Sequence, residues 1–415
     1  MRLATLAACW GALPSVMVKD SGIIVIFAAL IGASEMVSVM STALQDLAVC
    51  LLMLPWAALS DRLGVKRQIS LSMYVGVVAL LISVCAPWAH GWASSVLIGA
   101  LAIYAMAMSA YLAAWFPLLE QVVPPAVRGL FFGRMRFAWQ LTSTTFILVS
   151  GWFVGRYATI GRLQLIIVLA AVASLGRIFY VNRIVLKPIK ESPPMRLYDA
   201  IRDVLANRSL TGFGVYLFFL YTAANAAIPI VIVFARNDLH LADSLVIVLS
   251  AVAMGGLIIG FLIGGRLVQR YGVKALLLAT HIGFAVLNIS LLTIHSGGIG
   301  SVIKLATILA AYGILLASAS IAVSSELLAL ASPTNKAVSI AFGYSLYSAG
   351  LGVSRALASL VLGSGILSEQ WQIGTIVFTR YHSLFLANAV GVFLAMALLV
   401  FVPAVTHRVQ RLPAL

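Results

Sequence analysis

The stretch "AALSDRLGVKR", residues 57–67, decides the fold because a related stretch recurs later in the chain. The second copy is "GRLVQRYGVKA", residues 265–275, about 208 positions further along. The same offset relates Pro125 to Pro333 in another polar connection. Two matches at one offset predict a duplicated unit, arranged as a parallel repeat.

The composition places both copies in a membrane protein. Hydrophobic residues make up 62% of the chain and charged residues 9%, and the mean hydropathy is +1.07. This leaves too little polar surface to cover a soluble globule. The apolar runs are continuous and about 20 residues long, which is typical of membrane helices and not of barrel strands.

Twelve such runs can be read from the sequence. The first six cover residues 9–30, 36–59, 69–86, 94–116, 131–153 and 163–184. The second six cover residues 210–234, 244–264, 275–294, 302–325, 337–362 and 383–402. We therefore expect an all-α polytopic membrane protein with 12 transmembrane helices in two six-helix pseudo-repeats.

The longest polar segment separates the two sets of runs. We expect residues 1–185 to form an N-terminal half, residues 186–209 a cytoplasmic linker and residues 210–415 a C-terminal half. Within the linker, Leu197, Ile201 and Leu205 follow the i, i+4, i+8 spacing of a short amphipathic helix. The linker is too small to be a catalytic domain.

Lys19 and Asp20 interrupt the first apolar run, in "SVMVKDSGIIVIF". The repeat favours one helix here, because a single run occupies the equivalent place in the second half. Two other interpretations remain: a division at residues 19–22 into two spans, which gives thirteen spans and reverses the N-terminus, or a cleaved signal peptide.

The distribution of basic residues predicts the orientation. With the N-terminus inside the cell, about 19 of the 27 lysines and arginines lie on the cytoplasmic side, as the positive-inside rule requires. Both termini are therefore expected in the cytoplasm, and the protein in an inner or plasma membrane. The net charge of +15 is explained by this anchoring, and no nucleic-acid partner is expected.

The repeated loop resembles the signature motif of the major facilitator superfamily, and its second copy resembles the degenerate repeat of that motif. The residues of this gating motif are Asp61, Arg62, Gly64, Lys66 and Arg67 in the first loop and Gly265, Arg270, Gly272 and Lys274 in the second. The two glycines suit a very short turn. The basic residues suit contact with anionic headgroups.

The resemblance implies secondary active transport, in which two halves rock about a midplane site that opens to each side in turn. It also implies that helices 1, 4, 7 and 10 line the cavity. The chain departs from the family pattern at Ala57, Val65 and Gln269, and helix 4 lacks the arginine of many proton-coupled members. The coupling ion, H⁺ or Na⁺, therefore stays open.

The candidate cavity residues are charged, amide and aromatic side chains within the spans. They are Lys19, Asp20, Asp46, Tyr111, Arg136, Trp139, Gln140, Tyr221, Asn225, Tyr312 and Arg355. A charge at the centre of a membrane helix costs about 2.5–3.5 kcal/mol, so a function is the default interpretation. Aromatic walls with a few polar groups suit a small polar organic solute.

Depth in the membrane suggests how these charges pair. Counted along the helices, Lys19 and Asp46 lie within one turn of each other, whereas Arg355 lies nearer the outside. We expect Lys19 to pair with Asp46 in the substrate-free state. Asp20 is then expected to face the cavity and to bind solute or a coupling cation.

These features together predict a secondary transporter of a small polar organic solute, working as a monomer in the lipid bilayer. The alternative is a non-transporting sensor or a lipid-handling protein on the same scaffold. No pair of spans shows metal-ligand spacing or a nucleophile with a base, so an enzyme, a metal and a cofactor are not expected. The solute and the direction of transport cannot be read from the sequence.

Overall fold

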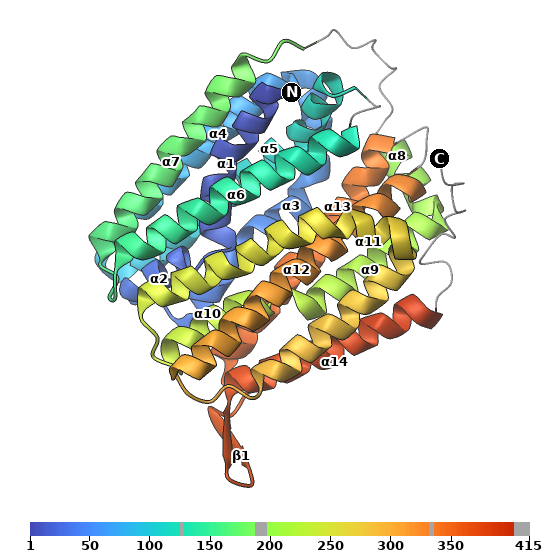
Figure 1. Ribbon diagram of the computed structural model, residues 1–415. Helices are drawn as coiled ribbons and strands as arrows, with labels where there is room; N and C mark the ends of the chain where they lie inside the picture. Colours follow the sequence, from blue (N-terminus) through green and yellow to red (C-terminus); the bar gives the residue numbers. More distant parts are fainter. Residues whose placement is uncertain (125–127, 187–196, 332–335, 402–415) are drawn as a thin grey trace.

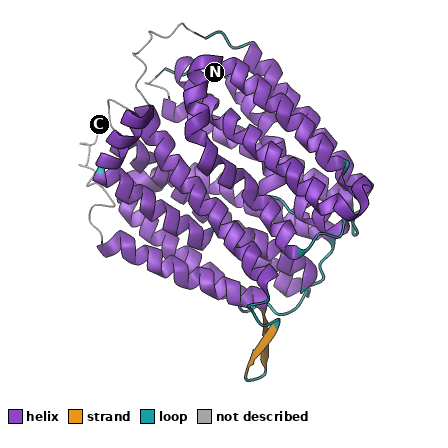
Figure 2. Ribbon diagram, turned by 180° about the vertical axis from the view of Figure 1, so that it is seen from behind, coloured by secondary structure: helices purple, strands orange, loops and turns teal. Residues whose placement is uncertain are grey.

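The computed structural model describes residues 1–124, 128–186, 197–331 and 336–401, and it is a helical bundle with one small β-hairpin (Figures 1 and 2). The elements before the linker are α1 (Arg2–Lys19), α2 (Ile23–Leu30), α3 (Glu35–Leu63), α4 (Val65–Val84), the 3₁₀ helix η1 (Ala86–Trp92), α5 (Ala93–Val122), α6 (Arg128–Val154) and α7 (Ile160–Asn182). Except for η1, all of them are α-helices.

The linker contains α8 (Leu197–Ala206). The elements after it are α9 (Arg208–Ala224), α10 (Ala227–Asn237), α11 (Asp243–Leu291), α12 (Ile299–Leu330), α13 (Lys336–Ser364), β1 (Gln370–Ile373), β2 (Ile376–Thr379) and α14 (Arg380–Phe401). The two strands are antiparallel, with Gln370 opposite Thr379. This hairpin projects from one end of the bundle, which we call the hairpin end (Figure 1).

In the described part of the chain, nine helices are long and apolar enough to cross a membrane, or ten if the bent pair α1 and α2 is one span. That count takes α11 as one helix, although its backbone breaks at Gly272, and it does not include α6. The arrangement is consistent with the twelve predicted spans.

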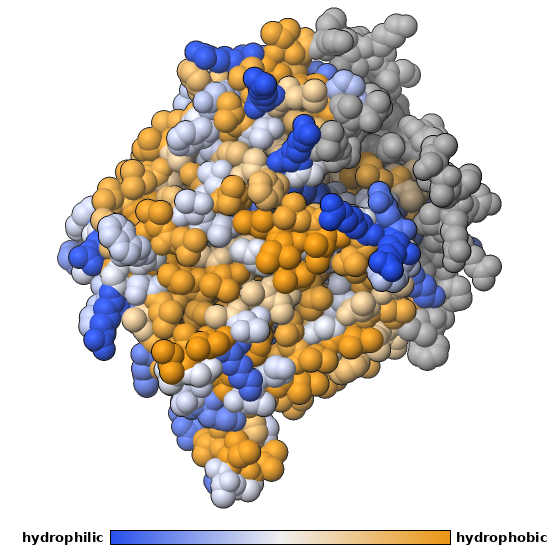
Figure 3. Space-filling model, in the orientation of Figure 1, coloured by the Kyte–Doolittle hydropathy of each residue, from blue (hydrophilic) through white to orange (hydrophobic). Residues whose placement is uncertain are grey.

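The side surface of the bundle is apolar. Figure 3 shows a broad orange region over the middle of the molecule, with hydrophilic side chains gathered mostly toward its ends. Leu51 and Trp152 are among the exposed apolar side chains, with exposed fractions of 72% and 83%. Such a surface is stable only in contact with lipid.

Helices pack in two groups that correspond to the two halves of the sequence. The helix α1 packs on α6 and α7, and α5 packs on α3 and α4; in the second group α9 packs on α13 and α14, and α11 packs on α12. The main contacts between the groups are α3 with α13 and α6 with α11. These two contacts are equivalent under the sequence repeat.

The two copies of the repeated loop have the same backbone geometry. Gly64 joins α3 to α4 with φ of +80°, and Gly272 breaks α11 with φ of +81°. No described atom outside the neighbouring residues lies within 4 Å of a Cβ built on either glycine, so space does not require glycine here. The positive φ requires it, which confirms the predicted turns.

Candidate functional site

The first membrane-spanning helix is broken at its middle. Its two parts, α1 and α2, meet at an angle of 47° on either side of Asp20, Ser21 and Gly22. The Gly22 amide donates to Ser250 Oγ at 3.1 Å, and the Lys19 carbonyl accepts from Arg355 Nη1 at 2.9 Å. Both partners belong to helices of the other half, so that half satisfies the backbone groups that the break leaves free.

The seventh spanning helix is also interrupted, between α9 and α10, but Asn225 and Ala226 keep right-handed helical φ and ψ there, and among the described residues the sharp bend of the first helix is not repeated. Pro229 lies in the first turn of α10 and has no N–H to continue the helix from Asn225, which explains the position of the break. The Ala226 amide donates to Ser354 Oγ at 2.9 Å, and Asn225 Nδ2 donates to the Leu351 carbonyl at 3.3 Å. Broken helices at matching places in two halves are typical of transport sites.

Two ion pairs lie at the first break. Lys19 Nζ is 2.8 Å from Asp46 Oδ1, which confirms the predicted pair, and Arg355 Nη2 is 3.1 Å from Asp20 Oδ1. The exposed fractions of these side chains are 18% for Lys19, 5% for Asp46, 3% for Arg355 and 39% for Asp20. Asp20 is therefore the more exposed of the two carboxylates.

The helix ends also suit the signs of these charges. Lys19 and Arg355 lie at the C-terminal end of α1, where free carbonyls favour cations. Asp20 lies just before the N-terminal end of α2, where amides favour an anion. The helix ends at the break thus stabilise Lys19, Arg355 and Asp20, and together with Asp46 these groups have no net charge.

The expectation that Arg355 lies nearer the outside than Lys19 was wrong. The helix α1 begins at Arg2 and not at Cys9, so Lys19 lies roughly 26 Å from that helix end, about 10 Å further than expected. Arg355 lies roughly 29 Å from the start of α13, at nearly the same depth. Its side chain therefore reaches the Lys19 carbonyl and Asp20.

The predicted aromatic residues divide between the second break and the interior of one half. Tyr312 donates to the Ala224 carbonyl at the end of α9, and the rings of Tyr221 and Tyr347 lie 4.4 Å apart. Tyr111 lies inside the N-terminal half. The guanidinium carbon of Arg177 lies over its ring, 3.9 Å from the ring centroid. Arg177 also donates to the Ala7 carbonyl at 3.1 Å, so this cation is part of helix packing within the N-terminal half.

The predicted residues of α6 face the other half. Arg136 Nη2 lies 3.5 Å from Ser324 Oγ, and its guanidinium lies 5.8 Å from the Phe261 ring centroid. Gln140 Nε2 donates to the Met254 carbonyl at 3.4 Å. Trp139 is half-buried against the main hydrophobic cluster. Arg136 and Gln140 thus join α6 to α11 and α12 across the interface between the halves.

The residues of the gating motif lie around the two glycine turns. Lys66 Nζ donates to the Asn182 carbonyl at 3.3 Å, and Arg270 lies over the Tyr271 ring. Arg67 and Lys274 are exposed, and Gly265 lies inside α11. The side chains of Asp61 and Arg62 lie outside the described part of the structure.

The two halves are joined firmly at the hairpin end. Glu35 of α3 accepts hydrogen bonds from Asn237 Nδ2 at 2.6 Å and Tyr381 Oη at 2.8 Å, and its other oxygen lies 2.9 Å from Arg380 Nη2. Nearby, the Ala158 amide donates to Asp243 Oδ2 at 2.9 Å. These contacts link the N-terminal group of helices to the C-terminal group.

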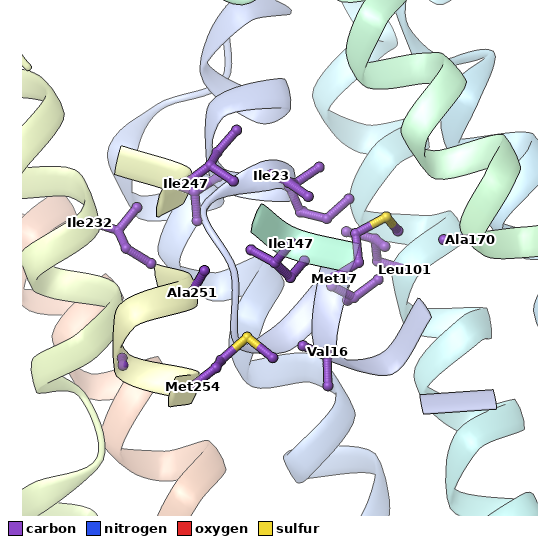
Figure 4. Close-up of a cluster of buried hydrophobic side chains, with 14 of the residues drawn as sticks. Val16, Met17, Ile23, Leu101, Ile147, Ala170, Ile232, Ile247, Ala251 and Met254 are labelled. Carbon is purple, nitrogen blue, oxygen red and sulfur yellow. The ribbon is translucent and has the colours of Figure 1, made fainter. Parts of the chain in front are cut away.

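An apolar cluster lies around the first break. Figure 4 shows Val16, Met17 and Ile23 of the broken helix near Ile247 and Met254, which belong to α11. The side chains are buried and form one hydrophobic core with members from both groups of helices. The cluster and the Glu35 contacts thus join the two groups of helices between the hairpin end and the first break.

Sequence reasoning missed several residues that complete the site. Ser250 and Ser354 accept from free amides at the breaks, Tyr347 packs on Tyr221, and Ser15 exchanges hydrogen bonds with Gln45 beside the Lys19–Asp46 pair. Serine is common in membrane helices, so the serines carried no signal in the sequence. Tyr347 could have been found, because it is an aromatic residue about two turns before Arg355 on the same helix.

Comparison with known proteins shows which family the chain belongs to. Its sequence matches the Major Facilitator Superfamily over residues 3–342. No curated protein has significant sequence similarity to it. Among solved structures, the nucleoside transporter NupG is similar with a TM-score of 0.68 and 14% identity, over 96% of this chain and 97% of that one.

Two further solved structures share the fold. A D-xylose-proton symporter has a TM-score of 0.70 and 13% identity, over 97% of both chains. A POT family transporter in complex with 5-aminolevulinic acid has a TM-score of 0.71 and 12% identity, over 98% of this chain and 96% of that one. At these identities the likeness shows the fold, and the family follows from the sequence match: the chain belongs to the major facilitator superfamily.

Proposed function

We propose that this secondary active transporter carries a small polar organic solute that binds between the two helix breaks. The observation that carries the proposal is the exposure of Asp20, a 39% exposed carboxylate at the middle of an apolar bundle. A carboxylate at that depth faces the bundle interior or a water-filled cavity and needs a partner, here the cation Arg355. Such a group is available to a solute or to a coupling cation.

The charges at the site favour a solute without net charge. Lys19, Asp20, Asp46 and Arg355 are two cations and two anions, so a charged solute would find no counter-charge in excess. Hydroxyl or amide groups of a neutral solute can bind Asp20 and Asn225, and the half-buried ring of Tyr347, packed on the buried Tyr221, offers an aromatic face. The nucleoside and D-xylose transporters of the same fold act on solutes of this kind, which supports the proposal.

Alternating access in this chain would use the two halves, residues 1–185 and 210–415, with the linker 186–209 between them. The contacts of α3 with α13 and of α6 with α11 are suitable pivots, because they relate the halves symmetrically. In this proposal both termini lie in the cytoplasm of an inner or plasma membrane, so the hairpin end, where the Glu35 contacts join the halves, faces outward. A monomer is sufficient for this mechanism.

We assign the binding of the coupling ion to the same carboxylate, Asp20. A proton or Na⁺ at Asp20 would weaken its pair with Arg355, and the guanidinium would then depend on its backbone partners, the carbonyls of Lys19 and Thr42. Since Arg355 belongs to one half and Asp20 to the other, occupancy of this site changes the contact between the halves.

The test is counterflow in proteoliposomes that contain the purified protein. Labelled nucleosides, pentoses, hexoses and amino acids serve as the panel. We expect saturable counterflow of at least one neutral solute, and its loss in Asp20→Asn but not in Asp203→Asn, an exposed aspartate of α8. Binding of a panel solute without counterflow would instead indicate a sensor. Full activity of Asp20→Asn would remove Asp20 from the site.

A further inference from the structure

Two consecutive residues of α13 contact both broken helices. Ser354 accepts a hydrogen bond from the Ala226 amide at 2.9 Å, at the break between α9 and α10. The next residue, Arg355, donates to the Lys19 carbonyl at 2.9 Å and to Asp20 at 3.1 Å, at the break between α1 and α2. The two breaks belong to different halves of the chain, so one turn of α13 joins them.

The helical geometry of α13 explains how this is possible. Neighbouring residues of a helix point about 100° apart, so Ser354 and Arg355 can reach two different helices from one place. The helix α13 packs on α9 along one side and on α3 along another. Arg355 also donates to the Thr42 carbonyl of α3 at 2.9 Å, which fixes its guanidinium toward the N-terminal half.

Burial makes both contacts necessary for the backbone. Ser354 and Arg355 each have an exposed fraction of 3%, and Ala226 is buried. A buried amide or carbonyl without a partner is unfavourable, and in a membrane bundle few waters replace the lost bond. The position of the second break therefore depends on Ser354, and that of the first break depends on Arg355 together with Ser250 of α11, which accepts from the Gly22 amide.

We infer that Ser354 and Arg355 are a pair of positioning residues that hold the two helix breaks at one depth, and that Ser354 acts on the site through the Asn225–Ala226 break without touching the solute. The inference depends on the proposed function in one respect only, namely that the solute binds between the two breaks. The geometry of the breaks themselves can be measured without any solute.

The two contacts differ in one respect. The Ser354 bond lies within the C-terminal half, so it persists when the halves move relative to each other. The Arg355 bonds cross between the halves, so they must change whenever α1 moves away from α13. Ser354 thus fixes one break on α13, and Arg355 makes the other break depend on the state of the transporter.

Hydrogen–deuterium exchange of the full-length protein in lipid nanodiscs tests this pair, with D₂O as the probe. In Ser354→Ala we expect the Ala226 amide to exchange about tenfold faster, with the Gly22 amide unchanged. Ser354→Thr keeps the hydroxyl and is expected to restore slow exchange. The matched control is Ser359→Ala on the same helix, whose buried hydroxyl donates to the Met36 carbonyl at 2.6 Å, away from both breaks.

The second variant tests the other member. Arg355→Lys keeps the charge beside Asp20 but not the fork of donors, so we expect faster exchange at residues 20–23 with Ala226 unchanged. Unchanged exchange at Ala226 in Ser354→Ala, or equal acceleration in Ser359→Ala, would overturn the inference. Transport by the same variants reports separately on the proposed function, so failure of either can be recognised.

Discussion

Glu35 at the hairpin end is the residue whose removal should change the state of the transporter most. Glu35→Ala removes the hydrogen bonds from Asn237 and Tyr381 and the ion pair with Arg380, all of which join the two halves. A hydrogen bond to a charged group contributes about 1.5–3 kcal/mol when buried, and an exposed ion pair about 0–1 kcal/mol. Because these side chains are partly exposed, we take about 3 kcal/mol for the set.

A loss of about 3 kcal/mol corresponds to a shift of roughly 150-fold in the ratio of closed to open states at the hairpin end. Glu35→Gln keeps an acceptor for Asn237 and Tyr381 and loses only the charge. We therefore expect it to shift the same ratio by about fivefold, which corresponds to about 1 kcal/mol.

Distances between spin labels measure this shift directly. Trp92 and Ile299 are exposed residues at the hairpin end, in the N-terminal and C-terminal halves respectively. Labels on cysteines at these positions, with Cys9, Cys50 and Cys85 replaced by serine, should report a longer distance in Glu35→Ala. Gln372→Ala is the control, because Gln372 is an exposed residue of the hairpin whose side chain donates to the Gly374 carbonyl within the hairpin. If Glu35→Ala leaves the distance distribution unchanged, the assignment of Glu35 as a latch is refuted.

The remaining predictions concern the first ion pair and the repeated loop. The double variant Lys19→Met with Asp46→Leu should be as stable as the unaltered protein, because no buried charge stays unpaired. Its transport rate should nevertheless fall about tenfold, and a normal rate would remove Lys19 from the mechanism. Gly64→Ala and Gly272→Ala should each lower the free energy of unfolding by about 1–3 kcal/mol, because both positions have a positive φ. Thermal unfolding measures this loss, and the control Gly265→Ala, a helical position with no described atom near its Cβ, should have little effect. Asp61→Asn should reduce transport and spare solute binding, with Gln269→Ala as the control; equal losses would count against a gating role.

Much of the fold could be predicted because it depends on properties that are local in sequence. Apolar runs gave the spans, and the repeat gave the equivalence of Gly64 and Gly272, whose backbone geometry is almost the same. The Lys19–Asp46 pair could be predicted because counting residues along two adjacent helices gives their relative depth.

The partners at the helix breaks could not be predicted in this way. The pairing of Arg355 with Asp20 depends on where α1 and α13 begin, and an error of one or two helical turns moved Lys19 by about 10 Å. The roles of Ser250 and Ser354 depend on tertiary contacts with amides that are free only because the helices break. No prediction covered the β-hairpin at residues 370–379, whose apolar run is only three residues long, far shorter than a membrane span.

Access to the first break from each side of the membrane tests the central claim, that the groups around Lys19 and Asp20 line a solute path that opens to one side at a time. Ser15, which exchanges hydrogen bonds with Gln45 beside the ion pairs, is half-buried and one turn from Lys19. Ser15→Cys, with the native cysteines replaced by serine, should react with an impermeant charged thiosulfonate only from the side of the termini. Adding Glu35→Ala should make it reactive from the hairpin side. Reaction from the hairpin side with Glu35 intact, or from neither side in both variants, would contradict the account.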